Sequence, residues 1–294
     1  MGGEYHHRPD FAQESLKNLI GMRYLFAQWK NIEERLKDKK IFLLLDYDGT
    51  LAPIVRRPEE ARIPEDTRSV IQALVKNPGC RVAIISGREL KDLQEKVGIQ
   101  GIIYAGNHGL ELEGPRIRFR KFLSKGYTQA LQKLRVELTR KMSPFRGVII
   151  EDKGLSLSIH YRRVPQKAVA QLKTVFHETV ITSFIADTVR IKEGKMVLEI
   201  RPPVEWDKGK IVLWLLARQQ FAAGGKRVFP VYIGDDSTDE DAFRALKDKG
   251  LTVLVGSPAV QSQARYYVRD TQEVYNLLRL IINSRIGEIH GGIS

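Results

Sequence analysis

The chain has almost no cysteine and no long hydrophobic run. Of its 294 residues only Cys80 is a cysteine, so no disulfide can form within the chain and a reducing compartment is allowed. No segment approaches the roughly 18 consecutive apolar residues of a transmembrane helix. The first ten residues lack the apolar core of a signal peptide. These absences predict a soluble, cytoplasmic protein without a membrane partner.

Positive charge is present in excess, and it is concentrated in one segment. The formal net charge is +13, and residues 115–203 contain 19 Lys and Arg against 7 Asp and Glu, so the rest of the chain is nearly neutral. A basic module that faces an acidic one would attract an anionic substrate to their junction. The alternative is a solvated basic surface without a role. No DNA- or RNA-binding motif accompanies the charge, so nucleic acid is not an expected partner.

The most informative stretch is residues 41–51, Ile-Phe-Leu-Leu-Leu-Asp-Tyr-Asp-Gly-Thr-Leu. Its first five residues are apolar, which predicts a strand buried on both faces. The strand ends at two acids, Asp46 and Asp48, and ligands of open α/β sheets bind at the carboxyl ends of the strands. Mg²⁺ prefers carboxylate oxygens and is the cation expected to compensate the two charges. Taken alone, this pattern could also be a solvated Asp-Gly turn.

Polar residues follow the other predicted core strands as well. Ser86-Gly87-Arg88 follows the strand at 81–85, where a hydroxyl and the free amides of a new helix can hold a phosphate oxygen. Taken alone, this triplet could simply cap that helix. Asn107 and His108 follow the strand at 102–105, and His108 could contact a ligand or hold the loop. An acid-rich helix start explains Asp239 to Asp241 but not Asp235 and Asp236, which follow the strand at 227–233.

The periodicity predicts an α/β fold with a Rossmann-like parallel sheet, interrupted by an α+β module. We expect a core at 40–114 and 204–294, an inserted cap at 115–203 and an N-terminal helical extension at 1–39. The extension has apolar residues at helical spacing from 11 to 38. The cap should contain helices at 125–142 and 165–179, with strands at 147–151, 155–161, 184–191 and 195–201, turns at Lys153-Gly154 and Glu193-Gly194, and both helices on one side of the sheet.

The strand-end motifs resemble those of the haloacid dehalogenase superfamily of phosphotransferases. The resemblance implies that Asp46 is a nucleophile that forms an aspartyl-phosphate and that Asp48 is the general acid and base. It also implies that Ser86 and Lys208 hold phosphate oxygens, with Lys210 as the alternate lysine. Mg²⁺ would be bound by Asp46, the backbone carbonyl of Asp48 and Asp235, and Asp239 would be a further acid that acts through water or Lys.

Within that superfamily, nearly the whole chain after residue 40 resembles the trehalose-6-phosphate phosphatase family. The similar segments are DYDGTLAPI, SGR, GNHGLE, KMVLEIRPP, WDKGK and GDDSTDEDAF. The resemblance implies that cap residues bind the distal glucose, and the matching positions are Glu151, Arg162, Lys195 and Glu199. Lys195 and Glu199 are four residues apart, so on a strand they would face the same side. Surface ion pairing is the alternative role for each of them. Gly87, Arg88, Asn107 and His108 complete the expected substrate contacts.

The resemblance implies a Mg²⁺-dependent phosphatase that hydrolyses trehalose 6-phosphate, and we expect no obligatory protein partner. Phosphatases of sucrose phosphate, glucosylglycerol phosphate or mannosyl-phosphoglycerate are the close alternatives. An inactive regulator that binds a sugar phosphate is the alternative from another class. The sequence contains no trehalose-phosphate synthase domain, and residues 1–40 match no motif known to us.

Overall fold

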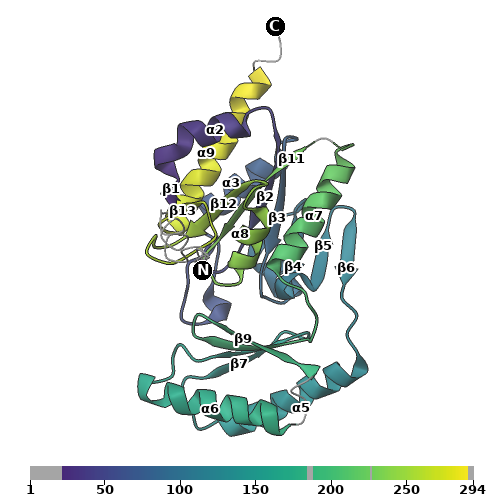
Figure 1. Ribbon diagram of the computed structural model, residues 1–294, viewed down its shortest axis with the longest axis vertical. Helices are drawn as coiled ribbons and strands as arrows, with labels where there is room; N and C mark the ends of the chain where they lie inside the picture. The colour runs from purple at the N-terminus through teal and green to yellow at the C-terminus, as the bar shows by residue number, and fades with distance from the viewer. Residues whose placement is uncertain (1–21, 184–187, 226, 291–294) are drawn as a thin grey trace, which may run out of the picture.

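The computed structural model describes residues 22–183, 188–225 and 227–290, and these residues form two sheets with helices packed against them (Figure 1). The larger sheet has nine strands. In spatial order they are β1 (Arg23–Tyr24), β13 (Tyr266–Val268), β12 (Leu251–Val255), β11 (Val228–Gly234), β2 (Lys40–Leu45), β3 (Cys80–Ile85), β4 (Ile103–Gly106), β5 (Glu111–Gly114) and β6 (Ile117–Arg120).

Strand β2 lies in the middle of this sheet and is buried on both faces. Ile41, Leu43 and Leu45 belong to one hydrophobic cluster, and Phe42 and Leu44 belong to the other. The first cluster is covered by α2 (Trp29–Leu36), α3 (Glu65–Lys76), α4 (Leu90–Val97) and α9 (Thr271–His290). The second is covered by α7 (Lys208–Ala222) and α8 (Asp239–Leu246). Two-sided burial of a continuous apolar strand is typical of parallel sheets, and the expected α/β fold is confirmed.

The register of the central strands brings their carboxyl ends together. β2 pairs in parallel with β11 on one side and with β3 on the other, and Ile233 of β11 lies opposite Leu45. The backbone N–H of Asp46 donates to the carbonyl of Ile233 at 2.9 Å. The residues that follow β2, β3 and β11 therefore meet at one edge of the sheet.

The far edge of the sheet contains a hairpin that the sequence analysis did not predict. β5 pairs antiparallel with both β4 and β6, and Leu112 and Ile117 are buried in the core. The alternation of Ile117-Arg-Phe-Arg120 is a strand signal that the basic composition of the segment obscured. Because β6 belongs to the larger sheet, we place the start of the inserted cap after Arg120 and not at residue 115.

The N-terminal region joins the core through a strand as well as a helix. Within the described residues, helix α2 occupies only 29–36, and Arg23 and Tyr24 pair in parallel with β13. The expectation of helices throughout 11–38 is therefore wrong for residues 23 and 24, whose backbone groups extend the sheet edge. The expected helical positions up to residue 21 lie outside the described residues.

The cap is a four-stranded antiparallel sheet with both of its helices on the side away from the core (Figure 1). Its strands are β7 (Ile149–Asp152), β8 (Leu157–His160), β10 (Val197–Arg201) and β9 (Arg190–Gly194), and its helices are α5 (Lys125–Met142) and α6 (Gln166–Thr182). Leu157, Ile159, Leu198 and Ile200 pack in the hydrophobic cluster with the helices. The alternate residues of the same strands face the core, because side chains alternate along a strand.

The hairpin of β9 and β10 differs from the predicted one. β9 occupies 190–194, whereas the expected strand at 184–191 lies partly outside the described residues. β9 continues through Glu193 and Gly194, and Met196 adopts a left-handed backbone with φ 63°. Lys195 therefore lies at the tip of the hairpin and not on a strand with Glu199.

Within the described part of the chain, no helix combines the length and apolar character that a bilayer-spanning segment needs.

Candidate active site

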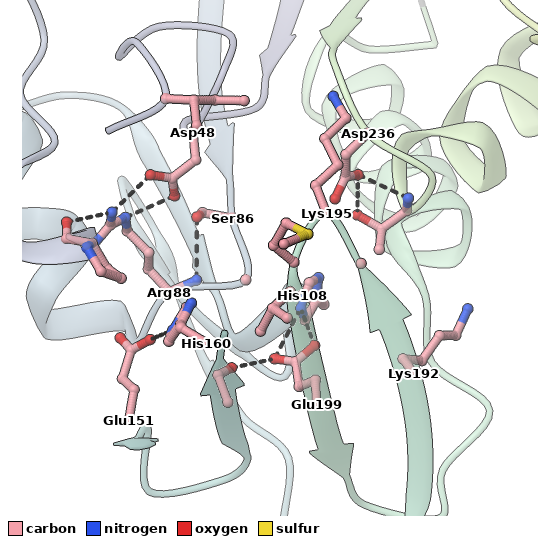
Figure 2. Close-up of a pocket in the computed structure, with 18 of the residues that line it drawn as sticks. Asp48, Ser86, Arg88, His108, Glu151, His160, Lys192, Lys195, Glu199 and Asp236 are labelled. Atoms are coloured by element: carbon pink, nitrogen blue, oxygen red, sulfur yellow. Dashed lines mark hydrogen bonds and ion pairs between the residues drawn. The ribbon is translucent and has the colours of Figure 1, made fainter. Parts of the chain in front are cut away.

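A cavity of about 200 Å³ lies where the strand ends of the core face the polar side of the cap sheet (Figure 2). Its lining includes most of the site residues expected from the sequence. These are Asp46, Asp48, Ser86, Gly87, Arg88, His108, Glu151, Arg162, Lys195, Glu199, Lys208 and Asp235. Of the expected site residues, only Asn107 and Asp239 are not part of the lining.

Three buried carboxylates gather near the ends of β2 and β11, and two of them, Asp46 and Asp235, line the cavity. One oxygen of each of Asp46, Asp235 and Asp239 lies within 4.8 Å of the others. The buried ammonium of Lys208 donates to Asp46 Oδ1 at 2.6 Å and to Asp239 Oδ1 at 2.7 Å. Lys208 is the first residue of α7, so the side chain of a helix N-terminus reaches the end of β2. The structure thereby distinguishes Lys208 from the alternate Lys210, whose Nζ bonds the carbonyl of Glu205 instead.

Asp239 differs from the other two acids because both of its oxygens are fully engaged. Oδ1 accepts from Lys208 and from the hydroxyl of Tyr232, the latter at 2.6 Å. Oδ2 accepts from the backbone N–H groups of Asp235 at 2.9 Å and Asp236 at 3.0 Å. Four donors leave no lone pair directed at the cavity. We therefore assign Asp239 to positioning of Lys208 and the β11 loop, and not to direct metal ligation.

Asp46 and Asp235 suit a hard divalent cation. Burial raises the pKa of Asp46 well above its usual value, Lys208 opposes the rise, and the neighbouring acids add to it. Burial also raises the pKa of Asp235 to about 6, against the effect of Lys195. Two lysines, Lys208 and Lys195, therefore do not fully compensate the three acids, and oxygen ligands of this kind fit Mg²⁺. Gly49 has φ 83°, and any side chain there would collide with the Asp235 carboxylate.

The carboxylate of Asp48 is held by Arg88 in a two-pronged ion pair (Figure 2). Arg88 Nε donates to Asp48 Oδ2 at 2.8 Å, and Nη2 donates to Oδ1 at 2.7 Å. Arg88 is buried and also donates to Asp92 and to the carbonyl of Pro58, so its guanidinium is fixed. In this arrangement Asp48 lies at the cavity wall, and both of its carboxylate oxygens are bonded to Arg88.

Ser86 and Gly87 form part of the cavity wall near Asp48. Ser86 is buried after β3, and its Oγ accepts from the backbone N–H of Arg88 at 3.2 Å. A Cβ atom on Gly87 would overlap the imidazole of His108. Gly87 therefore permits His108 to approach the Ser86 loop.

A charged network links the core loop of His108 to the cap. His108 has a left-handed backbone, φ 56°, and its Nε2 lies 2.6 Å from Arg201 Nη2 and 3.1 Å from Glu199 Oε2. Arg201 also donates to Glu199 through Nε, and Lys153 Nζ donates to Glu199 Oε1 at 3.3 Å. Burial opposes ionisation of Glu199, but Lys153, His108 and Arg201 hold the pKa of Glu199 well below its usual value.

Asn107 has a structural position that the sequence analysis did not foresee. It is fully buried, and its Nδ2 donates to Glu111 Oε2 at 2.8 Å and to the carbonyl of Lys153 at 3.1 Å. Its Oδ1 accepts from Ser156 Oγ at 2.9 Å. All of its groups that face the cap are engaged, so the expectation of a substrate contact is not supported. Asn107 instead fastens the core loop to the β7–β8 turn of the cap.

The remaining expected cap residues, Glu151, Arg162 and Lys195, line the cavity and differ in the partners that hold their side chains. Glu151 bonds His160 at 2.8 Å, and His160 and Lys153 hold its pKa at about 2 although burial opposes ionisation. Arg162 is exposed, and Nη2 donates to the carbonyl of Lys195 at 3.2 Å. Lys195 crosses to the core and bonds Asp235.

Several lining residues were missed in the sequence analysis. They are Lys153, Ser158, His160, Lys192, Arg201 and Asp236. Lys192 and Arg201 could have been found from strand alternation, because they share a face with Glu199 once β9 and β10 are in register. Lys153 gave no such signal, since its position in a Lys-Gly turn predicts a solvent-exposed side chain.

Comparison with known proteins identifies a family model and relatives that match most of the chain. The family model described as trehalose-phosphatase matches residues 44–272. The chain is 34% identical over 276 residues to a probable trehalose-phosphate phosphatase D of Arabidopsis thaliana, covering 90% of this chain and 73% of the relative. A trehalose-phosphate phosphatase of Mycobacterium tuberculosis is 35% identical over 214 residues, covering 72% of this chain and 53% of the relative.

The fold also has a similar solved structure. The C-terminal domain of C. albicans trehalose-6-phosphate phosphatase superimposes with a TM-score of 0.75 at 24% identity, covering 86% of this chain and 96% of that domain. At this identity the likeness concerns the fold alone.

Proposed function

The chain belongs to the trehalose-phosphatase family, and we propose on that basis that it hydrolyses trehalose 6-phosphate to trehalose and inorganic phosphate. This is a reaction of trehalose biosynthesis. The observation that carries the proposal is the position of Asp46. It lies at the end of the central strand, bonded to Lys208 and next to Asp235, and the polar face of the cap lies across the cavity from it.

Asp46 is proposed to act as the nucleophile. Oδ1 is occupied by Lys208, and among the described residues no donor bonds Oδ2, which leaves that oxygen for attack on phosphorus. The new bond joins Asp46 to phosphorus, and the bond from phosphorus to the sugar oxygen breaks. Water then attacks the aspartyl-phosphate, which releases phosphate and restores Asp46. Lys208 and Ser86 hold phosphate oxygens in both steps.

Asp48 is proposed to transfer the protons. It donates to the departing sugar oxygen in the first step and accepts a proton from the attacking water in the second. Its present bond to Arg88 fixes its position at the cavity wall. Asp48 must therefore exchange its contact with Arg88 for a contact with the sugar oxygen, and Arg88 is a positioning residue for the acid.

A divalent cation such as Mg²⁺, held by Asp46, Asp235 and the backbone carbonyl of Asp48, would neutralise the charge that develops on the phosphoryl group. Asp239 supports this arrangement indirectly, because it bonds Lys208 and the N–H group of Asp235. The three carboxylates therefore have two kinds of role, ligation and support.

The cap is proposed to select the disaccharide. Glu151, Arg162 and Lys195 present acceptors and donors that hydroxyl groups could satisfy, and they line the same cavity as Asp46. A site with buried polar groups rejects ligands that leave those groups unpaired. Glu199 contributes by holding Lys153 and Arg201 in place, because these cations already occupy its carboxylate.

The direct test is phosphate release from trehalose 6-phosphate by the purified chain, with and without Mg²⁺. Sucrose 6-phosphate, glucosylglycerol phosphate, mannosyl-phosphoglycerate and p-nitrophenyl phosphate serve as competitors of decreasing similarity. We expect the highest kcat/KM for trehalose 6-phosphate. Equal turnover of all five esters would contradict selection by the cap. Binding of trehalose 6-phosphate without any turnover would instead identify a regulator.

A further inference from the structure

A second cavity, of about 360 Å³, adjoins the first and is rich in positive charge. His108, Lys192 and Arg201 line both cavities. Arg190 and Lys210 line only the second. The second cavity is therefore bounded by strands β9 and β10 of the cap on one side and by the start of α7 in the core on the other. None of the expected phosphoryl-transfer residues, Asp46, Asp48, Ser86, Lys208 and Asp235, lines it.

The cap wall places two arginines directly opposite each other. Arg190 of β9 pairs with Arg201 of β10, and Lys192 pairs with Glu199 on the same face. Like charges at directly opposite positions destabilise a strand pair unless something compensates them. Arg201 is compensated by Glu199. Among the described residues, Arg190 and Lys192 form no ion pair or side-chain hydrogen bond, and Figure 2 shows the Lys192 ammonium turned away from Glu199.

The acids of the core wall do not supply the missing negative charge. Glu205 lies 3.5 Å from Lys210 Nζ. Asp207 accepts from the backbone N–H of Lys210 at 2.8 Å and so caps α7. Asp241 pairs with Arg244 at 3.3 Å. Glu205 and Asp241 thus each have a cation of their own and Asp207 caps α7, and in the described part of the chain no acid forms an ion pair with Arg190 or Lys192.

We propose that this second cavity binds a phosphate-like dianion at a site separate from the catalytic one. Arg190 and Lys192 would donate to the oxyanion, with Lys210 on the opposite wall, and an arginine fork suits a tetrahedral oxyanion. The source is either inorganic phosphate or the phosphate group of a metabolite. Arg201 and His108 form the boundary with the first cavity, so an occupant would contact the network that holds Glu199. This inference goes beyond the proposed function and does not depend on it.

The test is calorimetric titration of the full chain with inorganic phosphate in the presence of Mg²⁺. We expect two binding sites in the wild type. The double variant Arg190→Gln, Lys192→Gln should lose the second site or weaken it by at least about tenfold. The control double variant Arg163→Gln, Lys167→Gln removes the same charge from exposed cap positions outside the cavity and should keep both sites. Phosphate binding that is equally tight in all three proteins overturns the proposal, whether one site or two are seen. A single site that only the Arg190→Gln, Lys192→Gln variant loses supports the second cavity and counts against phosphate binding at the first.

Two further measurements locate the site and identify its source. Crystals soaked in tungstate should show an anion between β9 and the start of α7, and density confined to the pocket of Asp46 would contradict the proposal. Methylphosphonate, an organic dianion that cannot be hydrolysed as an ester, is titrated in parallel. Second-site binding of phosphate alone supports an inorganic occupant, and second-site binding of both supports a phosphorylated metabolite. Second-site binding of neither overturns the proposal.

Discussion

Lys195 Nζ lies 2.7 Å from the carboxylate of Asp235 and 2.7 Å from its backbone carbonyl oxygen. The lysine is at the tip of a cap hairpin, and its side chain is 53% exposed, whereas the side chain of Asp235 is 6% exposed. The ammonium group of a cap residue thus contacts a carboxylate that we assign to the metal. This one contact therefore joins the cap hairpin to the core and at the same time occupies an oxygen of Asp235.

The variant Lys195→Met tests this contact. Removal of the ammonium frees an oxygen of Asp235, which we propose as a metal ligand, so we expect Mg²⁺ to bind the substrate-free protein at least about threefold more tightly. Calorimetric titration with Mg²⁺ measures this directly. Lys192→Met is the matched control, because it removes a cation of the same hairpin that does not contact Asp235. An equal gain in both variants would mean that general electrostatics, and not competition, is responsible.

The variant Asp46→Asn tests the nucleophile. We expect phosphate release from trehalose 6-phosphate to fall by at least about 10⁴-fold, because an amide oxygen does not form the acyl phosphate. The melting temperature should change by no more than about 3 °C, since Asn fits the same space and relieves like-charge repulsion in the cluster. Phosphate assays and thermal melts of the purified variant check both expectations. Turnover near that of the wild type would refute the covalent route.

The variants Asp239→Ala and Asp235→Ala test the division between support and ligation. Asp239 is fully buried and has four donors, so its loss should lower the free energy of unfolding of the metal-free protein by about 3–5 kcal/mol. Asp235 is paired with a half-exposed lysine and is unfavourably buried, so its loss should change that free energy by no more than about 1 kcal/mol. Urea unfolding measures both. A similar loss in both variants would contradict the distinction.

The imidazole of His108 should make stability depend on pH. Burial and then Arg201 lower the pKa of His108 from 6.5 to about 4. The unfolded chain therefore binds more protons between those values, and this contribution to stability is complete above pH 6.5 and is lost as the pH falls towards 4. Relative to His108→Gln, the wild type should lose about 2 kcal/mol between pH 7 and pH 5. Urea unfolding of both proteins at each pH measures the difference, and a pH-independent difference would contradict the assignment.

The variant Glu199→Ala tests selection of the sugar. Loss of this carboxylate releases Lys153 and Arg201 beneath the cap, so kcat/KM for trehalose 6-phosphate should fall at least about tenfold more than kcat/KM for p-nitrophenyl phosphate. Steady-state assays with both esters provide the ratio. Glu178→Ala, at an exposed position on the outer helix α6, is the control and should leave the ratio unchanged. Equal losses for both esters would remove Glu199 from substrate selection.

The α/β class of the fold and the shared position of the residues that we propose for phosphoryl transfer were predictable because their signals are local. An apolar run followed by acids marks the end of a buried strand, and parallel strands bring such ends to one edge of the sheet. Asp46, Ser86 and Asp235 lie together for this reason, although they are far apart in the sequence. The β5–β6 hairpin was missed because its short strands resemble the basic cap in composition. β1 was missed because residues 23 and 24 continue a helical pattern.

The amino-acid sequence by itself determined which chemical groups are available at the strand ends and that a basic module is inserted between two halves of an α/β core. Only the tertiary structure decided which partners the donors and acceptors of those groups bond. Asp239 and Asn107 resemble ligands in the sequence, yet their partners in the fold saturate them. Lys195 reaches the carboxylate of Asp235, and Arg190 and Lys192 border a second cavity. The reason is physical, because each of these contacts joins segments that are remote in sequence, and no local pattern specifies the partner.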